Sequence, residues 1–228
     1  MSDIIARNWL DLYSHRDDPL RIYFILIQDP FWVYLDYGRR KYHAPTLIES
    51  EFCLAVLKRC EFLVKHVKKF EETFNEFTKY RRMVPTYGAI LLNKAMDKVV
   101  LVSSYISGYK GFPKGKINEG ESEIQCAIRE VYEEVGIDIT ELINDKEYLL
   151  IEGVDEKYLK LFVVASLDES MQMKPTVSYE IGEIKFYPIE ELENHCQKKS
   201  KMVKQVQQFI GLIQKWVRKK KKMRKNIN

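Results

Sequence analysis

Three glutamates lie close together in one short stretch of this 228-residue chain. Glu130 is followed three residues later by Glu133 and four residues later by Glu134, so on a helix all three carboxylates project from one side. Like charges at this spacing repel one another and destabilise a helix unless a cation neutralises them. Mg²⁺ and Mn²⁺ prefer carboxylate oxygens and also bind phosphates. The spacing therefore predicts a divalent-metal site that acts on a phosphate-containing substrate.

A helix must position these carboxylates, and the sequence marks both of its ends. Ser122 and Gln125 have the spacing of a capping box, and Gly136 suits the left-handed residue that ends a helix. We therefore expect a helix over Glu123–Val135. Its apolar stripe consists of Ile124, Ala127, Ile128, Val131 and Val135. The alternative for a run of glutamates alone is a solvated acidic face.

The surrounding residues extend this pattern beyond the helix. Gly115 is followed after five residues by Glu121, and after seven more by the run REVYEEVGI that starts at Arg129. This spacing resembles the Nudix box of hydrolases that cut a nucleoside diphosphate from another group. The resemblance implies an α/β/α sandwich with a mixed sheet. It also implies that the metal donors are Glu130, Glu133, Glu134 and the Gly115 carbonyl. Glu121 and Arg129 would support the loop and the helix.

Segments in and around the box resemble the mRNA-decapping branch of that family. They are the stretches VPTYGAI from Val84, GFPKGKI from Gly111 and CAIREVYEE from Cys126. The resemblance runs from about residue 7 to residue 195. It implies hydrolysis of the cap triphosphate bridge to 7-methylguanosine diphosphate and RNA with a 5′ monophosphate, with Mg²⁺ or Mn²⁺ as cofactor.

The same resemblance assigns further site residues. Trp32 and Asp36 match the cap-binding pair, since a cationic 7-methylguanine stacks on an indole and its edge donates to a carboxylate; by itself Trp32 is also an ordinary core residue. Glu180 matches the general base, with Glu183 as the weaker alternative. Lys114 and Lys116 flank Gly115 and are expected to contact phosphates, although loop solubility also explains them. Lys185 departs from the family, which often has a glutamate there.

The C-terminal segment is strongly basic. Of the 37 Lys and Arg residues, 12 lie after residue 196, which leaves 25 for a body that holds all 33 Asp and Glu. An amphipathic helix over 197–228 is expected to pack its apolar stripe, with Trp216, on the catalytic domain and to bind RNA outward. The residues expected on this RNA track are Lys201, Lys204, Lys215, Arg218, Lys219, Lys220, Lys221 and Lys222. Membrane binding or a nuclear signal are the alternatives.

We expect an α+β protein with four parts. Residues 1–80 form a helical regulatory and cap-recognition domain, 81–84 a linker and hinge, 85–196 the Nudix domain, and 197–228 the basic helix. Turns are expected at Pro30 and Pro45, and a helix cap at Thr46 with Glu49. Strands are expected at Tyr87–Asn93, Lys98–Ser104, Glu147–Glu152, Lys157–Ala165 and Gly182–Tyr187.

The remaining expectations concern the setting of the protein. Scattered cysteines and the lack of a long apolar run indicate reduced thiols in a soluble, cytoplasmic protein. The family resemblance implies RNA-decay granules as one location. Partners are capped RNA and, through the first domain, a small decapping activator subunit. Two rival functions are a Nudix hydrolase of free nucleotides or dinucleoside polyphosphates, and a non-catalytic RNA-binding module on this scaffold.

Overall fold

The computed structural model describes residues 19–38, 42–61, 63–105, 107–118, 120–152, 158–176, 181–192 and 204–225. The chain divides into two compact units. One comprises Met1–Val84 and Asn118–Gly120, and the other Pro85–Ile117 and Glu121–Asn228. Each unit has its own hydrophobic core.

The regular secondary structure in the described part of the first unit is all helical, as expected, while residues 1–18 lie outside that part. Its elements are α2 (Pro19–Leu26), α3 (Gln28–Val33), the π-helical turn η1 (Tyr34–Gly38), α5 (Glu49–Leu57), the 3₁₀ turn η2 (Val64–Lys69) and α6 (Phe70–Met83). The core is aromatic. Phe24 stacks on Phe77 with ring centroids 5.6 Å apart and meets Phe70 edge-on at 5.5 Å. Such offset and edge-on pairs fill space without polar groups.

Two local expectations for this unit were wrong. Pro30 does not mark a turn, because it lies in the first turn of α3, where a helix tolerates the missing N–H. Thr46 does not cap a helix either. Helix α5 begins at Glu49, and the Glu51 carboxylate accepts the N–H of Ile48 at 3.0 Å. A carboxylate of the first turn of α5 thus accepts a backbone N–H at the helix start, in place of a hydroxyl cap.

The expected linker over residues 81–84 is helical in its first three residues, because α6 continues to Met83. The Arg81 guanidinium donates to both oxygens of Glu49, at 2.7 and 2.9 Å, and lies 4.9 Å from the Phe77 ring centroid. A two-bond contact with a carboxylate gives Arg81 a defined position in the first unit. Extended backbone begins at Val84, which is the residue that precedes Pro85.

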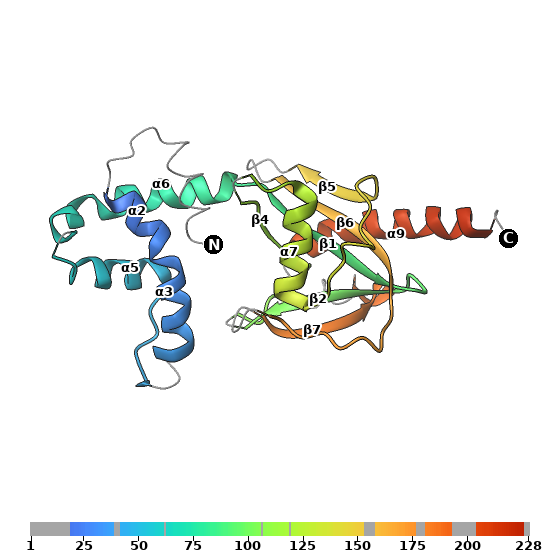
Figure 1. The fold of residues 1–228 in the computed structure, drawn as a ribbon, viewed down its shortest axis with the longest axis horizontal. Coiled ribbons are helices and arrows are strands. Elements are labelled where there is room, and N and C mark those ends of the chain that lie inside the picture. The colour runs from blue at the N-terminus through green and yellow to red at the C-terminus, as the bar shows by residue number, and fades with distance from the viewer. Residues whose placement is uncertain are drawn as a thin grey trace. The chain divides into compact units, whose positions relative to one another are not determined.

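The second unit is built on one mixed sheet (Figure 1). The expected strands are confirmed as β1 (Thr86–Asn93), β2 (Lys98–Ser104), β5 (Tyr148–Glu152), β6 (Tyr158–Leu167) and β7 (Ile181–Pro188). Two very short strands, β3 (Lys110–Gly111) and β4 (Lys114–Lys116), were not predicted. The main order is β3-β2-β1-β6-β5, with β4 beside β1 and β7 beside β2. Only β1 and β6 pair in parallel among these strands, so the expected mixed sheet is confirmed.

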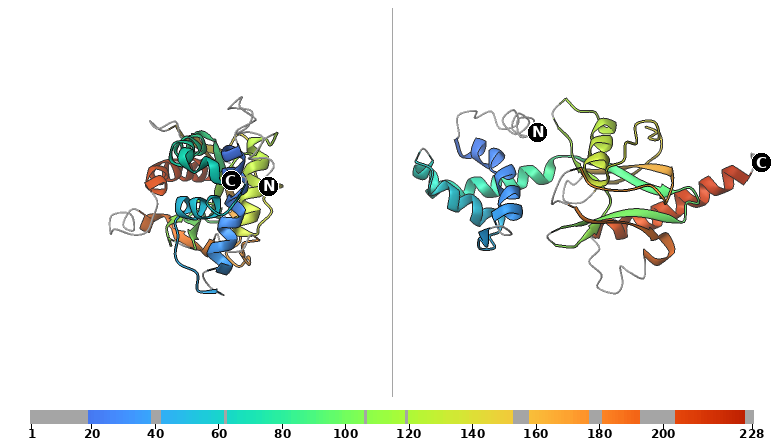
Figure 2. Two further views of the ribbon diagram at one scale, coloured as in Figure 1. Left: turned by 90° about the vertical axis from the view of Figure 1, so that its left-hand side faces the viewer. Right: turned by 60° about the horizontal axis from the view of Figure 1, so that its bottom comes forward.

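Helices α7 (Glu123–Val135) and α9 (Lys204–Lys225) cover opposite faces of this sheet (Figure 2). Along β1 the buried side chains alternate, so Ala89 and Leu91 belong to the core that α7 closes, while Ile90 and Leu92 belong to the core that α9 closes. This alternation is what makes the unit a three-layer sandwich.

Helix α9 is an integral part of the second unit, as its apolar stripe predicted. Val206, Phe209 and Ile213 are almost fully buried against the sheet. Glu147, just before β5, accepts the indole N–H of Trp216 at 2.7 Å and the Lys220 ammonium at 2.6 Å. The start expected near residue 197 lies outside the described residues. Among the described helices, none combines the length and apolar character needed to span a lipid bilayer.

Gly136 ends α7 with a φ of 77°, and a Cβ there would lie 2.1 Å from the carbonyl oxygen of Lys174. We expect Gly136→Ala to destabilise the chain by more than about 1 kcal/mol, because both the backbone angle and the contact resist a side chain. Gly211→Ala is the matched control, since α9 has open space at Gly211 and alanine is the better helix former there. Urea unfolding followed by circular dichroism measures both, and equal stabilities would contradict the strain at Gly136.

Glu147 generates a prediction about pH. Burial raises the pKa of its carboxyl, but the hydrogen bonds from Lys220 and Trp216 outweigh this, and the pKa lies below its ordinary value of 4.5. A carboxyl with a depressed folded-state pKa stabilises the fold above its unfolded pKa, and this contribution is lost as the pH falls below about 4.5. We expect Glu147→Gln to be less stable than the parent at neutral pH by no more than about 1 kcal/mol, because Glu147 is partly exposed.

The difference in stability between the parent and Glu147→Gln should shrink as the pH is lowered. Urea unfolding at a series of pH values measures it, and Glu141→Gln, on an exposed loop residue, is the control. A difference that stays constant down to acid pH would show that the ion pair with Lys220 does not stabilise α9.

Candidate active site

Helix α7 carries the glutamates between the ends that local sequence signals predicted. The Ser122 hydroxyl accepts the N–H of Gln125 at 3.3 Å, and the Gln125 side chain accepts the N–H of Ser122 at 2.8 Å. The predicted capping box and the Gly136 terminus are both confirmed. Val131 and Val135 are fully buried, whereas Glu130 and Glu133 lie on a partly exposed side of α7.

The Arg129 guanidinium is the centre of the polar contacts on this face. Its Nε and Nη2 donate to the two oxygens of Glu121 at 2.7 and 3.0 Å, and Nη2 also donates to the carbonyl oxygen of Lys116 at 3.0 Å. Its Nη1 donates to Glu130 at 2.6 Å and to Glu133 at 3.2 Å. The expected supporting role of Glu121 and Arg129 is therefore seen as direct contacts that join the loop before α7 to the helix.

Burial and charge act in opposite directions on Arg129. Burial lowers the pKa of its guanidinium, but the hydrogen bonds to Glu121 and the charge of Glu130 outweigh burial, and the pKa rises above its ordinary value. Arg129 is therefore charged at any pH at which the protein is folded. Its positive charge offsets the repulsion between neighbouring carboxylates.

The other two parts of the expected site, Gly115 and Glu134, lie at the same face. An added Cβ at Gly115 would fall 2.0 to 2.1 Å from the carboxylate atoms of Glu130, so only glycine lets this carboxylate lie against the β4 backbone. Glu134 is buried, with 8% of its surface exposed, and accepts the N–H of Lys114 at 3.2 Å. The Cys126 thiol, whose pKa burial raises, lies 3.8 Å from the Gly115 carbonyl oxygen.

These residues fit a hard divalent cation by donor chemistry, because the donors are carboxylate and carbonyl oxygens. In the part of the chain that the structure describes, however, no three acidic, histidine or cysteine side chains form a group that could hold a metal ion. The expected convergence of the three carboxylates is thus not seen. The reason is Arg129, whose Nη1 stands between Glu130 and Glu133 while Glu134 turns to the Lys114 amide. Their role as metal ligands remains a prediction.

Strand register decides where Lys114 and Lys116 point. Gly115 pairs with Tyr87, which packs against α7, whereas Lys114 and Lys116 pair with Gly88 and Thr86. Since side chains alternate along a strand, both lysines leave the sheet on the face opposite α7. The contacts described between these two residues and the glutamate face come from backbone groups, the Lys114 N–H and the Lys116 carbonyl. Phosphate binding by the two side chains stays a prediction.

Of the two candidate bases, Glu183 belongs to the described residues and Glu180 does not. Glu183, on β7, forms an ion pair with Lys185, and the hydrogen bond from Lys185 is the main reason why the pKa of Glu183 lies below its ordinary value. A carboxylate held ionised by a lysine is a poorer proton acceptor, which favours Glu180 over Glu183.

Trp32 and Asp36 are placed only by their backbones. Trp32 belongs to α3 and Asp36 to the π-helical turn η1, which follows it directly. Their side chains lie outside the described part, so cap binding by this pair stays a prediction.

The basic residues of α9 do not all have the same environment. Lys215, Arg218, Lys219, Lys221 and Lys222 are exposed, as an RNA track requires. Lys220 differs, because it pairs with Glu147 and lies 5.3 Å from the Trp216 ring centroid, so its position serves the packing of α9. Trp216 is half-buried in the core beneath α9, as predicted. Lys201 and the side chain of Lys204 lie outside the described residues.

One contact with the end of α7 had no signal in the sequence. The N–H of Thr176 donates to the carbonyl oxygen of Glu133 at 2.9 Å, and the N–H of Lys174 donates to that of Val135 at 3.0 Å. This segment satisfies carbonyls that a helix C-terminus leaves open. It lies some 40 residues further along the chain, so no local pattern could have pointed to it.

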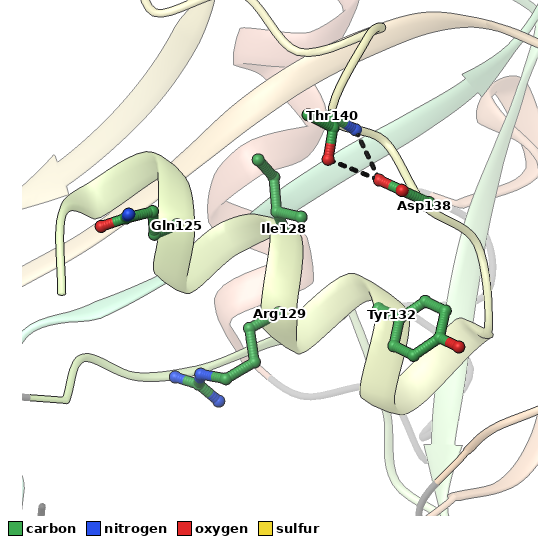
Figure 3. Close-up of a pocket in the computed structure, with 6 residues that line it drawn as sticks. All are labelled: Gln125, Ile128, Arg129, Tyr132, Asp138 and Thr140. Atoms are coloured by element: carbon green, nitrogen blue, oxygen red, sulfur yellow. Dashed lines mark hydrogen bonds between the residues drawn. The ribbon is translucent and has the colours of Figure 1, made fainter.

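A shallow pocket of about 460 Å³ lies along α7 (Figure 3). It is lined by Gln125, Ile128, Arg129, Tyr132, Asp138 and Thr140, and the Asp138 carboxylate accepts both the N–H and the hydroxyl of Thr140. Successive helix residues are about 100° apart, so Tyr132 projects about 200° around α7 from Glu130. Arg129 borders both the pocket and the glutamate face, but Glu130, Glu133 and Glu134 are not among the lining residues, so the pocket is not the candidate active site.

Comparison with known proteins agrees with this architecture. The NUDIX domain family model matches residues 82–206, which cover the sheet, α7 and the start of α9. The chain belongs to the Nudix family. A second model, the Dcp2 box A domain, matches residues 2–80. The Nudix unit is thus preceded by a helical unit with its own family match, as the resemblance of both parts implied.

Similar proteins match this chain over most of its length. The chain is 30% identical over 227 residues to the mRNA decapping complex subunit 2 of Schizosaccharomyces pombe, which covers 96% of this chain and 30% of that protein. It is 33% identical over 181 residues to the m7GpppN-mRNA hydrolase dcap-2 of Caenorhabditis elegans (77% and 23%). It is 28% identical over 192 residues to the m7GpppN-mRNA hydrolase of Saccharomyces cerevisiae (84% and 20%). The chain spans less than a third of the length of these relatives.

The contacts of Arg129 predict a large effect of a small change in the Nudix helix. Arg129→Lys keeps the charge but cannot serve Glu121, Glu130 and the Lys116 carbonyl together. We expect it to destabilise the chain by about 2 to 4 kcal/mol, because partly buried carboxylates lose hydrogen bonds. The control is Arg218→Lys on the exposed face of α9, and urea unfolding measures both. Equal stabilities of the two variants would mean that charge, rather than the guanidinium geometry, holds this face together.

Proposed function

We propose that this chain hydrolyses the triphosphate bridge of capped RNA and releases 7-methylguanosine diphosphate and RNA with a 5′ monophosphate. The main support is the combination of two matches on one chain, a Dcp2 box A domain at residues 2–80 and a NUDIX domain at residues 82–206. Relatives that match across both parts are named mRNA decapping subunit or m7GpppN-mRNA hydrolase. A hydrolase of free nucleotides does not account for the first unit or for the basic face of α9.

The metal in this proposal is Mg²⁺ or Mn²⁺, held by Glu130, Glu133, Glu134 and the Gly115 carbonyl. The donor chemistry supports this, because a hard divalent cation prefers carboxylate and carbonyl oxygens and because the contacts of Arg129 keep Glu130 and Glu133 on one side of α7. When bound, such an ion polarises bridging phosphate oxygens and lowers the pKa of a bound water. Arg129 and Glu121 connect the glutamate face of α7 to β4 and to the loop before α7.

Glu180 acts as the base. Addition of one water across the bridge forms one phosphorus–oxygen bond and breaks another, and the proton of the attacking water passes to the Glu180 carboxylate. A glutamate with an ordinary pKa of about 4.3 is ionised at neutral pH and can accept it. Glu183 is already engaged by Lys185.

The first unit recognises the cap through Trp32 and Asp36. The π-helical turn that contains Asp36 supports this, because such turns are rare and are frequent at functional sites. The indole stacks on the cationic methylguanine and the carboxylate accepts from its edge. The same unit binds an activator subunit, in keeping with a relative named as subunit 2 of a complex.

The body of the RNA lies along the exposed basic side of α9. Lys215, Arg218 and Lys219 are placed there, with Lys221 and Lys222 beside them. Phosphate contacts of this kind weaken steeply as salt is raised. A reaction on cytoplasmic mRNA, with RNA-decay granules as one location, follows from this substrate.

An assay of three substrates tests the proposal. Cap-labelled RNA, free cap dinucleotide and nucleoside triphosphates are incubated with the protein and Mg²⁺ or Mn²⁺, and the products are identified by chromatography. We expect 7-methylguanosine diphosphate from capped RNA, and a fall in its rate of at least about a hundredfold in Glu134→Gln. Glu141→Gln, an exposed residue after α7, should leave the rate unchanged.

Each rival function has its own outcome in this assay. Equal turnover of free nucleotides would make the chain a general nucleotide hydrolase, and RNA binding without turnover would make it a binding module. Glu180→Gln and Glu183→Gln form a matched pair for the base. The first should lower kcat and remove the acidic limb of the pH profile, and the reverse result would move the base to Glu183.

A further inference from the structure

An RNA that contacts both the glutamate face and α9 must pass around an edge of the sheet. Helix α7 lies on one face of the sheet and α9 on the other (Figure 2). The layers between them are packed, with Leu91, Ile90 and Val100 all fully buried. A nucleic-acid strand therefore cannot cross through the sheet and has to run over its rim.

The strand order places β5 at the rim beneath the basic end of α9. The main path through the sheet ends at β5, which pairs with β6. Glu147, the residue before β5, binds Trp216 and Lys220 on α9. The exposed basic residues Arg218, Lys219 and Lys222 belong to this same end of the helix. The rim at β5 therefore offers a strand that leaves the basic end of α9 a route to the other face.

Tyr148 stands at this rim on the α7 side. It pairs with Phe162, which belongs to the cluster that packs against α7, and it follows Glu147, which faces α9. The Tyr148 side chain is 42% exposed. The Lys160 ammonium lies 4.1 Å from its ring centroid, and Phe162 meets it edge-on at 6.4 Å. These contacts hold the ring in place while much of it faces solvent.

We propose that Tyr148 stacks on an unpaired base of the RNA where the strand leaves the basic end of α9 at the β5 rim. This rests on the proposed function for its RNA substrate. Aromatic rings beside a cationic groove bind single strands of any sequence, since every base has a face to stack. Exposure alone does not select Tyr148, because Tyr132 is 50% exposed but lies in the pocket on the outer side of α7.

The test measures the affinity of a capped, single-stranded RNA of about 30 nucleotides, long enough to span both helix faces. The full chain carries Glu134→Gln so that no turnover occurs, and binding is followed by fluorescence anisotropy at several salt concentrations. Tyr148→Leu should weaken binding by about tenfold, since a leucine fills the same apolar space but cannot stack. Tyr148→Phe should bind within about twofold of the parent. Tyr132→Leu is the matched control and should bind as the parent does.

The salt dependence separates stacking from charge. Tyr148→Leu should weaken binding at every salt concentration without changing the slope of log K against log salt, whereas Lys219→Gln should reduce that slope. Because Tyr148→Leu can disturb packing, 4-thiouridine RNA is also cross-linked to the chain with its tyrosine intact, and the cross-linked peptide should contain Tyr148.

Unchanged affinity of Tyr148→Leu, or a cross-link confined to other peptides, would overturn the proposal. An equal loss in Tyr132→Leu would do so as well, because it would mean that any exposed tyrosine matters. The proposed function fails separately. If the chain binds RNA through Tyr148 but releases no 7-methylguanosine diphosphate, only the proposed function is wrong. If Tyr148→Leu decaps normally and binds RNA as well as the parent does, only the stacking site is wrong.

Discussion

The contact between the Arg129 guanidinium and the carboxylates of Glu121, Glu130 and Glu133 is the interaction on which the glutamate face depends. Three acidic side chains within five residues of one helix would repel one another, and Glu121 adds a fourth negative charge nearby. The guanidinium has five N–H donors in a fixed plane, so it can serve several oxygens at once. Glu134 is the exception, because it is buried against the Lys114 amide and not against Arg129.

The same arginine joins secondary-structure elements. Through the Lys116 carbonyl it contacts β4, and through Glu121 it contacts the loop that leads into α7. Gly115 completes this arrangement, since any side chain there would displace the Glu130 carboxylate. Polar contacts at the surface thus connect α7, the loop before it and β4. Val131 and Val135 pack the buried side of α7 against the sheet.

The sheet separates two kinds of surface on one unit. Its α7 face carries the carboxylates and its α9 face carries the basic helix, and alternation along each strand sends neighbouring residues to different faces. Glu147 and Tyr148 illustrate the consequence. One faces α9 and holds it through Trp216 and Lys220, while the other faces the α7 side and leaves an aromatic ring at the rim.

Local signals predicted much of this unit. The ends of α7 and the strands β1 and β2 were predicted closely, because a capping box, a C-terminal glycine and long apolar runs act within a few residues. The short strands β3 and β4 were missed, since two or three residues carry no periodicity. The expectations for Pro30 and Thr46 were wrong, because Pro30 fits the first turn of α3 and because the Glu51 carboxylate replaces a hydroxyl cap. The boundary before Pro85 agrees with the two units, although α6 continues to Met83 and Arg81 contacts Glu49.

The sequence by itself determined the family, the glutamate spacing and the helix that presents it, because these depend on residue type and on distance along the chain. Only the tertiary structure decided that Arg129 stands between Glu130 and Glu133, that Lys114 and Lys116 leave the sheet away from α7, and that Lys220 anchors α9 to Glu147. Those outcomes depend on strand register and on which charged groups meet across the fold, and neither is encoded in a local pattern.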